Sequence, residues 1–235
     1  VETSVISSLR RNDVIQRVQK ACEDGRQAYW VCTLIEESDV FEAEAAEAIA
    51  KELRLVLPKL SIGLIHGRLK AGEKISIMEQ FKSKKIHLLV ATTVIEVGVD
   101  VSNASLMIIE NSERLGLSQL HQLRGRVGRG SDQSYCVLLY NSNLSHKSKE
   151  RLKIMRETSD GFELAERDLE MRGPGEILGA RQTGDIQFKV ANLMRDAHLI
   201  PRVKDVAQSI LSNDPDAAQH LIDRWLNGKD QLAHA

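Results

Sequence analysis

The sequence predicts an α/β fold in which helices flank a parallel β-sheet, followed by a smaller and mostly helical C-terminal segment. Three observations support this prediction. Short apolar runs alternate with helical stretches, which is typical of βαβ units. The apolar runs are continuous, as in Leu88–Ala91, which indicates strands that are buried on both faces. After Tyr140 no further strand-like run appears.

The expected strands are short apolar runs, and the expected helices carry apolar residues at helical spacing, such as Ile75, Met78 and Phe81. Strands are expected at Tyr29–Ile35, Ser61–Ile65, Ile86–Ala91, Ser105–Ile109 and Ser134–Tyr140. The intervening helices are expected at Ala43–Leu53, Ala71–Phe81 and Leu117–Val127. Functional sites of such folds gather at the carboxyl ends of the strands.

The polar stretch Asn141–Ser148 predicts a linker, so we expect one domain over residues 1–145 and a second over 146–235. Within the second part we expect a helical hairpin near Arg151–Met171, with the loop Arg181–Gly184 beside it. A last helix is expected at Asp214–Trp225, capped by Asp214 and with Pro215 at its first position.

Composition excludes several classes of protein. Charged residues make up 28% of the chain, and no apolar run approaches the roughly 18 residues that span a membrane. The formal net charge of −1 argues against a strongly basic nucleic-acid binder, so any contact with DNA has to be local. The three cysteines form no CxxC pair, which is typical of reduced cysteines in a cytoplasmic protein. The chain begins at Val1 without Met, and we expect it to be part of a longer protein.

The strongest motif is the run QLRGRVGR at Gln122–Arg129. If this run ends a helix, Gln122, Arg126 and Arg129 share one face at positions i, i+4 and i+7. Two guanidinium groups on one face are suited to bidentate hydrogen bonds with a phosphate. The alternative is an exposed basic helix end, where Arg complements the helix dipole.

Two further strand ends carry candidate nucleic-acid contacts. The run from Thr92 to Asp100 leads from a buried strand into a capping box formed by Thr93 and Glu96, which predicts a helix N-terminus suited to a phosphate. Gly98 permits a sharp exit from this helix. An ordinary capped helix is the alternative. His66 and Arg68 follow another strand, where a histidine also commonly has a purely structural role.

A nucleotide-cradling loop is absent from the sequence. A P-loop needs the pattern GxxxxGK[ST], whose glycines let backbone amides surround the phosphates. Gly228-Lys229 is the single Gly-Lys pair and is followed by Asp230. We find no metal-binding motif either. The chain therefore offers candidate arginine fingers without a site to hold ATP.

Taken together, these motifs resemble motifs IV, V and VI of superfamily 2 helicases, in the correct order. Tyr29–Ile35 resembles motif IV, Thr92–Asp100 motif V and Gln122–Arg129 motif VI, with the short motif at His66–Arg68 between them. The later part resembles the translocation segment shared by the RecG family and the transcription-repair coupling factors. Its matching stretches are Gly161–Glu176, Ala180–Gly184, Phe188–Leu193 and Leu221–Trp225. The Gly173-Pro174-Gly175 turn and the last two stretches favour the RecG family.

The resemblance implies a RecA-like second motor lobe and a role for each site residue. Arg126 and Arg129 reach the γ-phosphate of ATP, with Gln122 ordering the lobe interface. Gly98 and Asp100 couple the nucleotide to DNA, while Thr92, His66 and Arg68 contact DNA. The remaining matches lie in the translocation segment and are Arg151, Arg172 and Gln182.

The resemblance also implies the partners. ATP and Mg²⁺ are held mainly by an N-terminal lobe, and a wedge domain engages branched double-stranded DNA such as forks and Holliday junctions. We expect a cytoplasmic monomer whose present segment is inactive alone as an ATPase. Two alternatives stay open at this point: the same lobe in a motor that acts on RNA polymerase, and a passive module that binds DNA or protein. The partner of the acidic stretch Glu36–Glu52, if one exists, is not indicated by the sequence.

Overall fold

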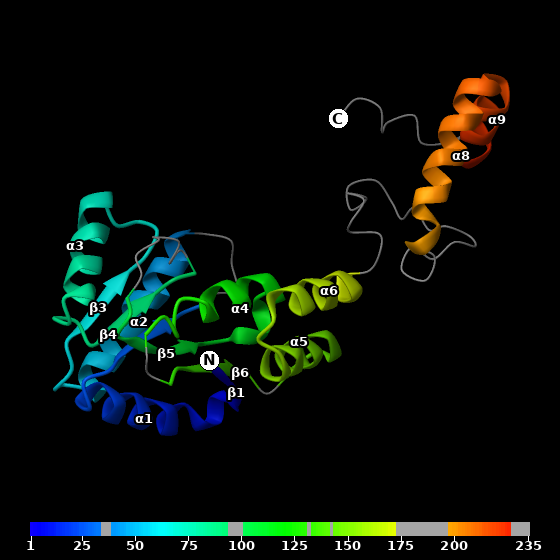
Figure 1. Cartoon of the computed structure of the whole chain (residues 1–235). Helices are drawn as coiled ribbons and strands as arrows, with labels where there is room; N and C mark the ends of the chain where they lie inside the picture. Colours follow the sequence, from blue (N-terminus) through cyan, green and yellow to red (C-terminus); the bar gives the residue numbers. More distant parts are fainter. Residues whose placement is uncertain (34–38, 94–100, 131–132, 142, 173–196, 227–235) are drawn as a thin grey trace. The chain divides into compact units, whose positions relative to one another are not determined.

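A computed structural model describes residues 1–33, 39–93, 101–130, 133–141, 143–172 and 197–226. The chain forms two compact units, Val1–Asp168 and Leu169–Ala235. The first unit contains the sheet and also the helices that directly follow it (Figure 1). The compact unit therefore extends beyond residue 145, where the sequence suggested a boundary.

The sheet has six parallel strands in the order β1-β6-β5-β2-β4-β3. This confirms the predicted parallel α/β architecture. The strands are β1 (Glu2–Ser7), β2 (Gln27–Val31), β3 (Ile62–Ile65), β4 (Leu88–Ala91), β5 (Ala104–Ile109) and β6 (Tyr135–Tyr140). Because all strands are parallel, their carboxyl ends meet at one edge of the sheet.

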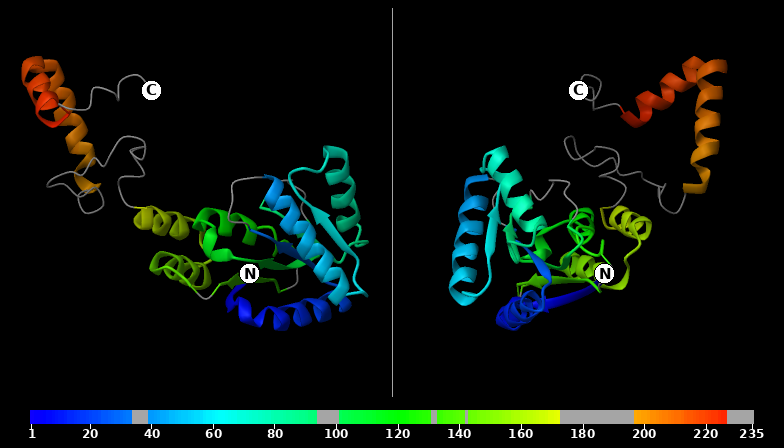
Figure 2. Two further views of the ribbon diagram at one scale, coloured as in Figure 1. Left: turned by 180° about the vertical axis from the view of Figure 1, so that it is seen from behind. Right: turned by 60° about the vertical axis from the view of Figure 1, so that its left-hand side comes forward.

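Helices cover both faces of the sheet (Figures 1 and 2). In the first unit these are α1 (Arg11–Glu23), α2 (Asp39–Val56), α3 (Ala71–Lys82), α4 (Leu117–Arg124), α5 (His146–Glu157) and the greater part of α6 (Gly161–Arg172). Two short 3₁₀ helices, η1 (Ser8–Arg10) and η2 (Ser112–Arg114), follow β1 and β5.

Alternate residues of the central strands build two separate cores. Trp30 of β2 packs with α1 and α2 in one buried cluster, together with Val90 and Ile108 of the neighbouring strands. Tyr29, one residue earlier, points to the other face and meets the ring of Phe81 on α3, with ring centroids 4.9 Å apart. A strand with both faces buried has no polar side, which explains the continuous apolar runs in the sequence.

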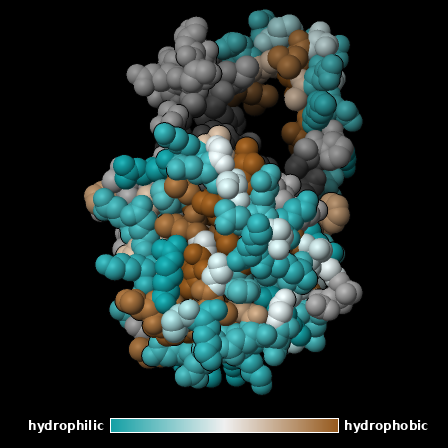
Figure 3. Space-filling view, turned by 90° about the vertical axis from the view of Figure 1, so that its left-hand side faces the viewer, coloured by the Kyte–Doolittle hydropathy of each residue, from teal (hydrophilic) through white to brown (hydrophobic). Residues whose placement is uncertain are grey.

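The face at the α2–α3 end of this unit is mainly hydrophilic, with apolar side chains between the polar ones (Figure 3). Large side chains exposed on these two helices include Phe41, Leu55 and Ile75. Within the described parts of the chain, no helix has the length and apolar character needed to cross a membrane. The described residues likewise hold no group of three or more His, Cys, Asp or Glu side chains arranged to bind a metal ion.

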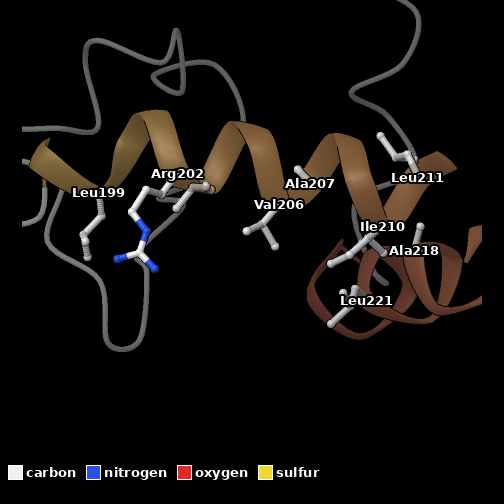
Figure 4. Close-up of a pocket in the computed structure, with 9 residues that line it drawn as sticks. Leu199, Arg202, Val206, Ala207, Ile210, Leu211, Ala218 and Leu221 are labelled. Carbon is white, nitrogen blue, oxygen red and sulfur yellow. The ribbon is translucent and has the colours of Figure 1, made fainter. Parts of the chain in front are cut away.

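The second unit contains the 3₁₀ helix η4 (Ala197–Leu199) and the helices α8 (Ile200–Asn213) and α9 (Pro215–Leu226). An apolar groove lies between them, and Leu221 and Ala218 of α9 face Ile210 of α8 (Figure 4). The predicted cap of the last helix is confirmed, because the Asp214 carboxylate accepts a hydrogen bond of 3.0 Å from the backbone amide of Ala217.

Candidate nucleotide and DNA interface

The carboxyl edge of the sheet carries a chain of polar side chains that follows the order of four neighbouring strands. The Ser8 hydroxyl after β1 donates to Asn141 Oδ1 after β6, at 3.1 Å. Asn141 Nδ2 donates to Asn111 Oδ1 after β5, at 2.7 Å. Asn111 Nδ2 then donates to the carbonyl of Thr33 after β2, at 3.1 Å. This chain of bonds fixes the loops on which functional residues are expected.

Asn111 adopts a left-handed backbone with φ of +48°, a conformation that Asn tolerates better than most residues. The hydroxyl of Thr33 closes the same region by donating to the Glu110 carbonyl at 2.6 Å. The sequence analysis did not single out Thr33, Asn111 or Asn141. Asn111 and Asn141 closely follow expected strands, which is the signal that could have found them, whereas Thr33 lay inside the strand expected at Tyr29–Ile35.

The next two strands toward β3 are followed by buried polar groups that have no hydrogen-bond partner among the described residues. The side chain of Thr92, after β4, is buried, and its hydroxyl has no hydrogen-bond partner within the described ranges. His66, after β3, is also buried, and its Nδ1 has no hydrogen-bond partner among the described residues. Its Nε2 lies 3.6 Å from Glu47 Oε1. A backbone hydrogen bond of 3.2 Å from Thr92 N to the Ile65 carbonyl holds the two strand ends together.

Unpartnered buried polar groups are uncommon, and they are worth explaining where they occur. Here two of them lie on adjacent strand ends, at the positions where the sequence predicted contact with DNA. Arg68, two residues after His66, is exposed. Gly98 and Asp100, together with the helix start predicted after Thr93, lie outside the described residues.

The run that resembles motif VI begins in α4, but the helix ends earlier than predicted. Arg126 N donates to the Leu123 carbonyl and Val127 N to the Arg124 carbonyl, a tighter pattern than that of an α-helix. Gly128 then takes φ of +86°, which stops the helical path. The prediction that Gln122, Arg126 and Arg129 share one face of a helix is therefore wrong, because α4 ends at Arg124.

The two arginines still lie at the surface. Arg126 is partly exposed and Arg129 is exposed, as is Gln122. Arg129 Nε donates to the Gly125 carbonyl at 3.1 Å, which ties this side chain back to the end of α4. Exposed guanidinium groups next to a helix end have the chemistry needed to bind a polyphosphate. This chemistry fits the ATP that the sequence resemblance implies.

The predicted helical hairpin is present as α5 and α6, separated by residues 158–160. Arg151 of α5 is half-buried, and its Nη2 donates to the Glu113 carbonyl at 2.7 Å and to Ser148 Oγ at 3.2 Å. Arg151 therefore fastens α5 to η2 of the lobe. Arg172 is the last residue of α6, and its side chain is not among the described groups, while Gln182 lies outside the described residues.

A partly buried cation, Arg11, was not anticipated from the sequence. The Arg11 guanidinium lies over the Trp30 ring at 5.3 Å and bonds both Glu52 of α2 and Glu110 after β5. Burial opposes the charge of Arg11, but these two carboxylates raise its pKa overall. With two anionic partners and an aromatic neighbour, this group joins α1, α2 and the sheet and is satisfied within the lobe.

Residues 11–131 match the helicase conserved C-terminal domain. The chain belongs to this helicase C-terminal domain family. Residues 158–225 match the C-terminal part of domain 3 of the ATP-dependent DNA helicase RecG, which confirms the resemblance to the RecG family.

Relatives named ATP-dependent DNA helicase RecG match the whole chain. The chain is 60% identical to the protein of Pasteurella multocida and 58% identical to that of Escherichia coli K12, and spans 34% of the length of each. A solved structure of RecG bound to a three-way DNA junction superposes with a TM-score of 0.66 and 42% identity, over 85% of this chain and 25% of that one. The chain thus corresponds to about a third of the length of these relatives.

Proposed function

We propose that this chain supplies the second motor lobe and the translocation segment of an ATP-dependent translocase of double-stranded DNA. Such a motor remodels stalled forks and Holliday junctions by branch migration. The observation that carries the proposal is the placement of Arg126 and Arg129 at the surface directly after α4, in a chain whose entire length matches RecG relatives.

In this proposal the nucleotide lies between this lobe and an N-terminal lobe. ATP and Mg²⁺ are held mainly by the N-terminal lobe, and the metal neutralises charge on the phosphates. Arg126 and Arg129 complete the site from the opposite side, while Gln122 orders the interface. An arginine finger contributes about 10³ to 10⁵ in rate in comparable phosphoryl-transfer systems.

DNA is proposed to meet the carboxyl edge of the sheet near β3 and β4. Arg68 is exposed there, and the buried hydroxyl of Thr92 and the imidazole of His66 have unused hydrogen-bonding capacity in the described structure. Gly98 and Asp100 couple this edge to the nucleotide, and Arg151, Arg172 and Gln182 convert lobe closure into movement along the duplex. A wedge domain engages the junction, and the complete enzyme acts in the cytoplasm as a monomer.

The first test is ATP hydrolysis by the purified chain, with and without branched duplex DNA. We expect no turnover in either condition, because the chain has no P-loop. DNA-stimulated turnover that disappears in Arg129→Ala would mean that the chain holds a complete nucleotide site, and the half-motor proposal would be abandoned.

The second test places this chain in a chimera, where it replaces the corresponding part of Escherichia coli RecG. The chimera is expected to hydrolyse ATP in the presence of a DNA junction. Arg129→Ala should reduce this turnover by about 10³-fold or more while junction binding is retained. The matched control is Arg17→Ala, an exposed arginine on α1, which should leave turnover unchanged. Retained turnover in Arg129→Ala contradicts the finger role.

DNA binding by the purified chain alone tests the alternative of a passive binding module. When the logarithm of the DNA affinity is plotted against the logarithm of the salt concentration, the slope is about −0.9 for each phosphate neutralised. The net charge of −1 leads us to expect weak binding and a shallow slope for the isolated chain. Tight binding with a steep slope would favour the passive module.

A further inference from the structure

The amino edge of the sheet, where the parallel strands begin, carries a group of basic side chains. Residues 82–85 have the sequence KSKK between α3 and β4, and all four are exposed. Lys59 is exposed between α2 and β3, and Arg26, directly before β2, is partly exposed. The amino-edge basic surface consists of Arg26, Lys59, Lys82, Lys84 and Lys85. In a chain with a net charge of −1, a local excess of positive charge is typical of a surface that contacts a polyanion.

Hydrogen bonds hold the three connections at this edge against one another. Ala28 N donates to the His87 carbonyl at 3.0 Å. Ser61 N donates to His87 Nδ1 at 2.9 Å, and His87 N donates to the Ser61 carbonyl at 2.8 Å. One basic residue lies two positions before each of these three bonded residues, and the three are Arg26, Lys59 and Lys85. Their side chains therefore start from neighbouring points of a fixed backbone.

Lys84 adopts a left-handed backbone with φ of +62°. The turn around it is well fixed, because Lys84 N donates to the Phe81 carbonyl at 3.1 Å and Lys85 N to the Gln80 carbonyl at 2.9 Å. Ser83 Oγ also donates to the Gln80 carbonyl, at 3.2 Å. Glycine or asparagine would adopt this backbone with less strain. Conformation alone therefore does not account for a lysine at this position, and a functional reason is indicated.

Interactions within the lobe do not account for the lysines either. Lys82 is in the last turn of α3, where it complements the helix dipole. Lys84 and Lys85 lie beyond the helix end, and Lys59 lies in a different connection. No ion pair between described residues includes Lys59, Lys84 or Lys85. Three exposed ammonium groups are thus available to a partner.

The chemistry of the surface favours the backbone of double-stranded DNA. Residues 82–85 contain no aromatic or apolar side chain, and Phe81 beside them is buried. Single-stranded nucleic acid is bound largely by stacking on exposed aromatic rings, which this surface lacks. Lysine is depleted at interfaces between proteins but common in contacts with phosphates. An acidic protein segment is the alternative, since Leu55 and Val56 are exposed at the end of α2.

The amino edge faces away from the edge that carries the DNA contacts of the proposed motor. Those contacts are near His66 and Thr92, after β3 and β4. The four residues of β4, which span roughly 13 Å, separate the two edges. The helices α2 and α3 end on the side of the sheet where β3 and β4 begin (Figure 1). A straight duplex on the carboxyl edge therefore does not also follow the amino edge.

We propose that the amino-edge basic surface binds the phosphate backbone of a second duplex arm of the branched substrate. This inference rests on the proposed motor function, because it takes a first arm to lie along the carboxyl edge. The contact reads charge and not sequence, since lysine ammonium groups meet phosphates that every sequence shares. Its role is to hold one arm while the motor moves along another.

The test measures the affinity of the chimera with Escherichia coli RecG for two junctions, one with arms long enough to reach the amino edge and one with short arms. Lys84→Asn/Lys85→Gln removes two positive charges, and Asn suits the left-handed backbone, so stability should be retained. For the long-armed junction, the slope of log affinity against log salt should become shallower by about 2. The affinity itself should fall about ten-fold or more at low salt. The short-armed junction should bind the variant and the unmodified chimera alike.

The matched control is Arg17→Gln/Lys51→Gln, which removes the same charge at exposed positions on α1 and α2 and should change neither quantity. Unchanged binding of the long-armed junction by Lys84→Asn/Lys85→Gln overturns the proposal. This includes the case where that variant loses affinity for poly-glutamate instead, which would indicate an acidic protein partner. An equal loss in the control variant, or an equal loss on short arms, overturns it as well.

Failure of the motor function itself looks different. The unmodified chimera would then show no DNA-dependent ATP hydrolysis sensitive to Arg129→Ala. If the motor function holds, Lys84→Asn/Lys85→Gln should hydrolyse ATP at the unmodified rate once the junction is saturating, because neither lysine belongs to the nucleotide site.

Discussion

Gln27 offers a quantitative test of the lobe's stability. Its side chain is buried, and Nε2 donates to the carbonyls of Phe81 at 2.6 Å and Ile86 at 2.7 Å. These two carbonyls flank the connection from α3 to β4. Asn103 Nδ2 adds a contact of 3.3 Å to Gln27 Oε1. The amide therefore joins the start of β2 to two other segments.

Replacing this amide by the apolar side chain of Met removes the side-chain donor from both carbonyls. The Phe81 carbonyl keeps the backbone amide of Lys84 at 3.1 Å, so its loss is one hydrogen bond of about 0.5–1.5 kcal/mol. The Ile86 carbonyl loses its side-chain donor at about 1–3 kcal/mol. Burial of the thioether offsets part of these losses, and we expect a net decrease in the free energy of unfolding of about 1.5–3 kcal/mol.

The assay is urea and thermal unfolding of the purified chain, followed by circular dichroism. For a unit of this size, 1 kcal/mol corresponds to roughly 2–4 °C in Tm, so a decrease of about 3–12 °C is expected. Gln16→Met, at an exposed position on α1, is the matched control and should change Tm little. If Gln27→Met unfolds within 1–2 °C of this control, roughly the spread of neutral surface changes, the hydrogen bonds of Gln27 do not stabilise the lobe as argued.

Four further predictions concern the cysteines, His121 and the cap of α9. Burial raises the pKa of the Cys22 and Cys136 thiols to about 12, so both should react slowly with a thiol reagent in native protein at pH 8 and rapidly after unfolding; equal rates in the two states would contradict their burial. Their raised pKa also stabilises the fold fully below the unfolded value near 9, and this contribution should be lost as pH rises toward 12, which unfolding measured at increasing pH can detect. Burial, and then the charge of Arg124, lowers the pKa of His121 below 6.5. The free energy of unfolding should therefore decrease as pH drops below 6.5, and it should decrease more in wild type than in His121→Asn. Parallel curves of stability against pH for the two proteins would refute this. Asp214→Ala should destabilise α9 by about 1 kcal/mol through loss of its cap on Ala217, measured as reduced helical ellipticity, whereas Asn213→Ala, which precedes the cap, should have a smaller effect.

The sequence alone determined the parts of the fold that depend on local pattern. Continuous apolar runs predicted five of the strands, because a strand covered on both faces has no polar side. The cap of α9 was also predictable, since Asp214 and Pro215 act on the backbone within a few residues. A helix leading into the motif arginines followed from the same kind of local pattern, although α4 stops at Arg124 and does not continue through them.

The first strand and helix were not predicted. The burial of β1 is only partial, and the strand exists because it pairs with β6, more than a hundred residues later in the chain. The end of α4 was also misplaced. Glycine can continue a helix or adopt a left-handed backbone, as Gly128 does, and residue spacing does not show which of the two it adopts.

The tertiary structure alone decided the partners of the buried polar groups. In the sequence Arg124 is one of three arginines in a basic run. In the structure it is buried and donates to the Met155 carbonyl at the end of α5, a helix that begins more than twenty residues later. The chain of Ser8, Asn141, Asn111 and Thr33 likewise follows the order of the strands in space and not along the sequence. Residue type sets what a side chain can bond, but the crossovers of a parallel sheet decide which groups come within bonding distance.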